Sequence, residues 1–235
     1  MPAKPRLTMY EEILLLALDD RKGTAAMESG HANAMGGAIL AELMLLGALK
    51  IDTVKKKKFV DAEPGAQVDD PLLAECLDLV RTAKRRKTAV DWVFKFAGVK
   101  DLKNRVARGL VGKGVLSEEH DKVLGIFPRT KFPERDPGPE QALIERLRQA
   151  VLTDADKVDE RTLVVAVIAN ATAMLPRVIG KKELKGRKAR LKVLAEGQLA
   201  GAATAEAVAA AQAAALMAIV AATVATTAAT SAATS

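Results

Sequence analysis

A run of six apolar residues near the N-terminus constrains the fold more than any other feature of this sequence. Residues 13–18 read Ile-Leu-Leu-Leu-Ala-Leu, and they closely follow Thr8-Met9-Tyr10-Glu11, the pattern of a helix-starting capping box. A helix that is apolar nearly all round has no side that suits water, so it belongs in the centre of a domain. The sequence therefore predicts a central helix that other elements cover.

Further helices follow along the chain, each with a start or stop signal. Residues 39–46 carry a second apolar helix, and Gly47 stands where glycine commonly ends a helix. Asp and Thr side chains cap helix starts, and a proline suits the first helical position. The predicted N-caps are Asp70 (followed by Pro71), Thr88 and Asp101. Longer helices are expected near 139–152, 159–175 and 181–197.

Two hairpins and an extended arm interrupt the helices. Residues 49–54 alternate with period two, which predicts a strand, and lysines at 55–58 form the turn to its partner. Residues 115–116 and 123–127 predict a second hairpin. Residues 127–140 contain four of the nine prolines, which predicts a stiff arm. The fold class is therefore mainly α: a single helical domain with a core of buried helices, decorated by two small β-hairpins and a Pro-rich arm.

The ends of the chain are expected to differ from the domain. We expect a disordered N-terminus over 1–6, the domain over 7–225 and a frayed Thr/Ser/Ala tail over 226–235. Residues 207–235 carry no charge and include 15 alanines, which favours an Ala-rich helix packed on the domain. A membrane span needs about 20 strongly apolar residues, which this segment lacks. The early apolar run also lacks the flanks of a secretory signal.

Catalytic and metal chemistry has few candidate residues. The two histidines are far apart, and Cys76, the one cysteine, lies inside the apolar pattern of residues 72–80, where a buried and inert thiol is expected. No Ser-His-Asp set and no phosphate-binding glycine loop occurs. The sequence therefore predicts a protein that is not an enzyme, with no catalytic residue, no metal site and no cofactor.

Positive charge is the more informative signal. The formal net charge is +7, which favours an anionic partner. Lys100 and Lys103 lie three residues apart at a predicted helix start, where backbone N–H groups also favour an anion. This pattern fits a phosphate cradle or a solvated face.

The densest basic run lies between residues 181 and 192. It combines seven cations with an apolar side, and it suits either an anionic membrane surface or solvent. The residues expected to form a membrane-facing basic patch are Lys181, Lys182, Lys185 and Lys188.

Two other functional classes stay open. A basic helix at 100–108 followed by a hairpin is typical of a winged helix that binds nucleic acid, although its side chains show no arrangement for reading base edges. A soluble protein-interaction scaffold is the other alternative.

Several segments resemble the Golgi phosphoprotein 3 family. These segments are Leu7–Gly23, Ile39–Leu43 with Gly47, Asp70–Leu73, Val90–Val93 and Leu110–Leu116, in the order of the family. Residues 127–137 resemble the arm of its bacterial members. The resemblance implies a mainly helical domain with β-hairpins. It also implies a relation to eukaryotic members that bind phosphatidylinositol 4-phosphate on membranes and tether Golgi enzymes.

The resemblance also implies a headgroup site. The family pocket uses a Trp, an Arg and two basic residues three apart, and the basic pair falls on Lys100 and Lys103. The Arg falls on Gly36, and the Trp falls on Met27 or Glu28. We therefore expect a non-catalytic peripheral membrane protein on the cytoplasmic membrane surface that binds a phosphoinositide or another anionic lipid headgroup. Protein clients are a further implied partner, nucleic acid is not favoured, and the oligomeric state is left open.

Overall fold

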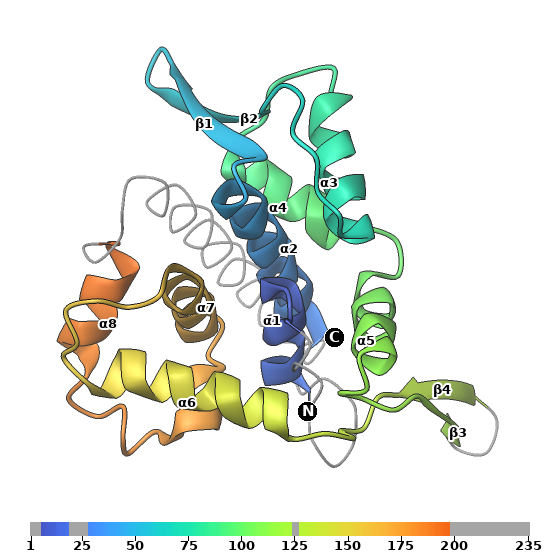
Figure 1. Cartoon of the computed structure of the whole chain (residues 1–235), viewed down its shortest axis with the longest axis vertical. Helices are drawn as coiled ribbons and strands as arrows, with labels where there is room; N and C mark the ends of the chain where they lie inside the picture. The colour runs from blue at the N-terminus through green and yellow to red at the C-terminus, as the bar shows by residue number, and fades with distance from the viewer. Residues whose placement is uncertain (1–5, 19–27, 124–126, 198–235) are drawn as a thin grey trace, which may run out of the picture.

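The computed structural model describes residues 6–18, 28–123 and 127–197 of the 235-residue chain (Figure 1). The first half contains α1 (Met9–Ala17), α2 (Glu28–Leu45), β1 (Leu49–Val54), β2 (Lys57–Ala62), α3 (Pro71–Arg81), α4 (Ala89–Ala97) and α5 (Leu102–Gly112). The second half contains β3 (Glu119–Val123), β4 (Phe127–Lys131), α6 (Gly138–Leu152), α7 (Glu160–Ala171), the π-helix η1 (Pro176–Gly180) and α8 (Lys188–Ala195). The strands pair into two two-stranded antiparallel sheets, which confirms the mainly α fold. Residues 1–5 and the Ala-rich helix and tail predicted over 207–235 lie outside the described residues.

Helix α1 is the central element, as the sequence predicts. All of its residues are buried, and it packs against α2, α5, α6 and α7 (Figure 1). Thr8 and Glu11 form the predicted capping box, in which Glu11 Oε2 accepts the Thr8 N–H at 2.8 Å. The core around α1 is built largely from Leu, Ile, Val, Met and Ala side chains.

Buried carboxylates hold the surrounding helices to this centre. A buried carboxylate is costly unless a cation and hydrogen bonds satisfy it. The ion pairs are Glu11–Lys113 at 2.5 Å, Glu12–Arg146 at 2.7 Å and Glu42–Arg161. Their cations come from the end of α5, from α6 and from α7, so each pair fixes a different helix beside α1 and α2.

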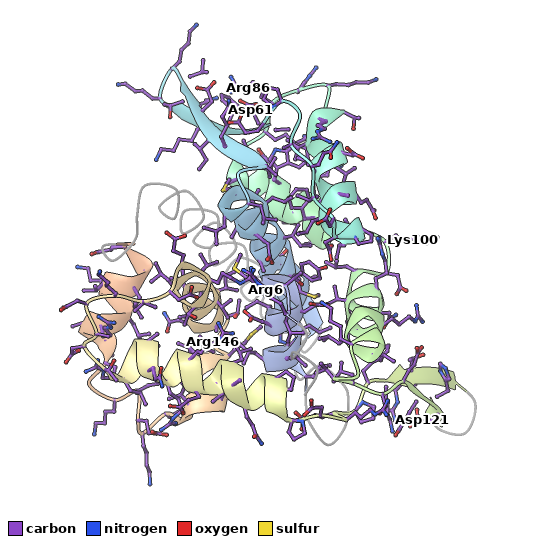
Figure 2. The ribbon with its side chains drawn as sticks, in the orientation of Figure 1. Arg6, Asp61, Arg86, Lys100, Asp121 and Arg146 are labelled. Atoms are coloured by element: carbon purple, nitrogen blue, oxygen red, sulfur yellow. The ribbon has the colours of Figure 1, made fainter. Side chains whose placement is uncertain are left out.

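The first hairpin forms with the predicted strand, and its turn consists of Lys55 and Lys56. Both residues have positive φ, 47° and 68°, which matches the twist that two-residue hairpins prefer. Arg86 holds the hairpin from outside, with hydrogen bonds to Asp61 and Asp52 and its guanidinium 5.0 Å from the Phe59 ring centroid (Figure 2).

The second hairpin differs from the predicted one. Its strands are β3 and β4, so residues 115–116 lie outside it and the predicted arm begins as β4. Val115 and Leu116 are buried instead, because the chain leaves α5 through Gly114 at φ +75° and the Val115 N–H donates to Leu110 O. The pairing of β3 with β4 brings Asp121 opposite Arg129, at 2.7 Å.

Two helix boundaries also differ from the prediction. The predicted helix over 181–197 is wrong over its first half: residues 181–186 form turns, and Gly186 has φ +91°, which breaks the helix before α8. Helix α2 starts at Glu28, about three turns earlier than residue 39. The early start places His31 on a helix and not in a loop.

Of the three predicted N-caps, two are confirmed. The Asp70 carboxylate accepts the Leu72 and Leu73 N–H groups at 3.0 and 2.9 Å, and Thr88 forms a capping box with Asp91. Asp101 does lie at the N-cap position of α5, but it has φ 56° and its side chain makes no capping hydrogen bond, so only its position is confirmed.

Candidate functional site

A cavity of about 380 Å³ lies where α1, α2 and the start of α5 meet. Its lining residues are Leu14, His31, Ala32, Met35, Ala97, Val99, Asp101, Leu102, Lys103 and Asn104. The α1, α2 and α4 side of the cavity is apolar except for His31, whereas the start of α5 contributes most of the polar groups. Volumes of this order are typical of small-ligand sites, which combine an apolar wall with a few placed polar groups.

The structure brings one of the two predicted lysines into this cavity. Lys103, in the first turn of α5, lines the wall and is half-buried. Lys100 is exposed on the turn before α5, between Val99 and Asp101, which both line the cavity (Figure 2). The predicted pair therefore divides into one lysine inside the cavity and one outside its lining.

Neighbouring cations on α5 already have anionic partners. Arg105 pairs with Glu75 at 2.6 Å, and Arg108 pairs with Asp101 at 3.4 Å and with Glu118 at 3.3 Å. Among the residues that the structure describes, Lys100 and Lys103 have no ion pair. The uncompensated positive charge at the start of α5 thus belongs to the two lysines.

The polar group on the α2 side of the cavity is His31, which the sequence reasoning missed. The residue is 8% exposed, and its Nδ1 has no hydrogen-bond partner within the described part of the chain. Burial, Arg177 and Lys103 together lower the pKa of His31 to about 4, since each disfavours the charged ring. The available sequence signal was a single polar ring on the apolar face of α2, where Ala34 and Met35 are buried.

Arg177 reaches this region from η1 and is fixed there. Its guanidinium donates to the carbonyl oxygens at the end of α1, at 3.3 Å to Ala17 O and 3.2 Å to Leu18 O. These bonds satisfy the exposed end of the helix dipole. The positive charge of Arg177 therefore stays near His31 whether or not the cavity is filled.

Gly36, the position implied for the family arginine, has no room for a side chain. A Cβ at this position would lie 2.5 Å from Val93 O and 2.9 Å from Ala97 N. Both atoms belong to the backbone of α4, which packs directly on α2. The positions implied for the family Trp are Met27, outside the described residues, and Glu28, at the first residue of α2.

In the second predicted site, the basic run near α8, the lysines and the arginines have different surroundings. The four lysines of the predicted patch, Lys181, Lys182, Lys185 and Lys188, are all exposed. The two arginines instead hold the end of α6: Arg187 donates to Val151 O at 2.9 Å, and Arg190 donates to Ala150 O at 3.0 Å. The one acidic residue of the run, Glu183, pairs with Arg148. Within the described residues the four lysines make no ion pair, whereas the arginines hold the end of α6.

The single cysteine is buried. Cys76 lies in α3 with no exposed surface, and burial raises the pKa of its thiol to about 12. A protonated, inaccessible thiol is a poor nucleophile, as expected from the sequence.

Together these features define a mainly helical domain with a cationic cavity at a helix start and a separate exposed lysine patch. In the described ranges, no helix has the length and apolar character that crossing a bilayer requires. The same residues contain no group of three His, Cys, Asp or Glu side chains placed to hold a metal ion. The profile of the Golgi phosphoprotein 3 (GPP34) family matches residues 9–211, so the chain belongs to this family. The resemblance noted in the sequence is thereby confirmed.

A curated relative supports the same relationship. The chain is 28% identical over 163 residues to vacuolar protein sorting-associated protein 74 of Eremothecium gossypii. The matched region covers 61% of this chain and 49% of the relative, so the chain spans about half the length of that protein.

Proposed function

We propose that this chain is a non-catalytic peripheral membrane protein that binds anionic lipid headgroups, including phosphatidylinositol 4-phosphate, in the cavity at the start of α5. One observation carries the proposal: Lys103 lines a cavity of headgroup size and, like Lys100 beside it, has no ion pair among the described residues. A phosphate placed there would meet Lys103 and the first N–H groups of α5, with the positive charge of Lys100 on the adjoining turn. Membership of the Golgi phosphoprotein 3 family supports this choice.

The exposed lysine patch supplies the second part of the proposed membrane contact. Near an anionic surface each lysine contributes about 1 kcal/mol, so Lys100 and Lys103 alone give about 2 kcal/mol, which is too little for stable attachment. The patch at 181–188 adds four exposed lysines. In Figure 1, which looks down the shortest axis, α5 and α8 lie at opposite edges of the broad face. The proposal requires the two clusters to contact one bilayer together.

The same role implies a location and partners for the chain. The chain acts at the cytoplasmic surface of a membrane, where anionic lipids are abundant, and protein clients are recruited to the bound form. The relative's name links that protein to vacuolar protein sorting, a membrane process, which agrees with such a role.

Vesicle flotation tests the headgroup site. Lys100→Glu with Lys103→Glu should abolish the preference for vesicles containing phosphatidylinositol 4-phosphate over vesicles of equal charge without it. The matched control is Lys55→Glu with Lys56→Glu, which changes the net charge equally at the exposed turn of the first hairpin. The proposal fails if both double variants lose the preference alike. A duplex-DNA mobility-shift assay is carried out in parallel with the flotation assay. DNA binding that exceeds vesicle binding would favour the winged-helix alternative.

A further inference from the structure

His31 is a buried polar group for which the described residues provide no partner. Its ring lines the cavity opposite Lys103, it is 8% exposed, and its Nδ1 makes no hydrogen bond there. A buried polar atom without a partner destabilises the fold, so each such atom in a native structure calls for an explanation. A ligand in the cavity is the explanation that the location of the ring supports.

Burial and the charges around His31 disfavour the protonated ring. Lys103 and Asp101 face the cavity from the start of α5, and Arg177 approaches from η1. Leu14 of α1 and Ala97 of α4 add only apolar surface. Burial lowers the pKa of His31 to about 4, and the positive charges of Arg177 and Lys103 add to this effect, while Asp101 is itself paired with Arg108.

An anion in the cavity favours protonation of His31. A dianion beside Lys103 offsets the two positive charges that oppose protonation of His31, and a protonated imidazole can donate from both ring nitrogens. The negative oxygens then provide an acceptor for His31 Nδ1, which has no hydrogen-bond partner among the described residues. Arg177 stays in place because the end of α1 holds it, so the change at His31 follows from the ligand.

We propose that His31 is the inner contact of the anion site and takes up a proton from solvent when the site is filled, so that binding strengthens as the pH falls. This inference rests on the proposed headgroup site and adds a regulation to it. It also gives the site a polar contact of its own on α2, where Gly36 has no room for the arginine that the resemblance implies.

The size of the effect follows from linkage. The free site binds a proton only near pH 4, whereas the negative charge of a bound dianion favours the protonated ring and raises the pKa of His31 toward its ordinary value of about 6.5, against the burial that still lowers it. Protons then bind more tightly to the complex than to the free protein between these values. The affinity for a dianion should therefore rise from about pH 7.5 to about pH 5.5, by up to about tenfold for a complete return to the ordinary pKa.

Sulfate is the probe for the test, because its charge stays constant over this range while that of a phosphate monoester changes. Proton NMR of the imidazole C2–H follows the site directly, since the chain has only two histidines, and His120 is an exposed internal reference. His31→Gln assigns the signal and keeps a polar side chain. His120→Gln is the matched control. Vesicles containing phosphatidylinositol 4-phosphate are run in parallel to distinguish a lipid headgroup from a free anion.

The expected result is a His31 signal that titrates at higher pH with sulfate than without it. The pH dependence of sulfate binding should be lost in His31→Gln and kept in His120→Gln. Anion binding that needs Lys103 but has the same pH dependence in His31→Gln overturns this inference and leaves the headgroup site standing. Absence of sulfate and vesicle binding at every pH overturns both. An unfolded His31→Gln leaves the NMR titration of the unmodified chain to decide.

Discussion

Because α2 packs on α4, we expect alanine to have opposite effects on stability at two glycines of α2. Gly36→Ala adds a methyl group that would lie 2.5 Å from Val93 O and 2.9 Å from Ala97 N. Both are backbone atoms, so no side-chain rotation relieves the overlap. Gly30→Ala adds the same group to α2 where no described atom lies within 4 Å.

The expected magnitudes follow from two opposing effects. Alanine is favoured over glycine inside a helix by about 1 kcal/mol at most, and this gain applies to both sites. At Gly36 the helices must also separate by roughly 0.9 Å to restore ordinary contact, and overpacking of this kind costs about 1–3 kcal/mol. We therefore expect Gly36→Ala to lose about 1–2 kcal/mol of unfolding free energy, whereas Gly30→Ala stays neutral or gains up to about 1 kcal/mol.

Urea unfolding followed by tryptophan fluorescence measures this difference. Trp92 is the one tryptophan of the chain, it is 2% exposed, and it precedes Val93 in α4, so its emission reports on the contact itself. Circular dichroism provides the second probe and tests whether the transition is two-state. An unfolding midpoint for Gly36→Ala equal to or above that of Gly30→Ala would refute the packing argument.

Two further predictions separate structural from functional charges. Arg161→Met leaves the buried Glu42 carboxylate without its cation, and it should lower the unfolding free energy measured in urea by about 3–5 kcal/mol. Adding Glu42→Gln, which keeps an acceptor for the Met9 N–H, should recover much of this loss. A double variant no more stable than Arg161→Met alone would contradict the pairing argument. Replacing Lys181, Lys182, Lys185 and Lys188 by Gln should weaken pelleting with all anionic vesicles alike, flatten its salt dependence and leave the melting temperature unchanged. Arg187→Ala should instead lower the melting temperature, because its hydrogen bonds to Val151 O and Thr153 O are lost. Unchanged vesicle pelleting of the four-lysine variant would refute the role of the patch.

Local signals predicted the helices well. The capping pairs Thr8–Glu11 and Thr88–Asp91 join residues three apart, so the same short stretch contains both the signal and its partner. Leu49–Val54 likewise carries its alternation within six residues. The mainly α class, the central α1 and the first hairpin followed from such patterns.

Signals that depend on distant partners were misjudged. Residues 115–116 have strand-like side chains, but they complete the core after α5, and the second hairpin instead forms from charged residues paired across β3 and β4. The helix predicted over 181–197 had the right apolar spacing, yet Gly186 adopts a positive φ that spacing does not reveal.

The candidate site shows the same division. The sequence by itself predicted that a basic pair stands at a helix start, because Lys100 and Lys103 are three residues apart. Only the tertiary structure decided that Lys103 lines a cavity with His31, since the ring comes from α2, some seventy residues earlier in the chain. It also decided that arginines of the 181–192 run bind carbonyls at the end of α6, while Lys181, Lys182, Lys185 and Lys188 are exposed. The physical reason is that caps and turns are satisfied by neighbours in sequence, whereas burial, charge compensation and proton affinity depend on which distant segments pack together.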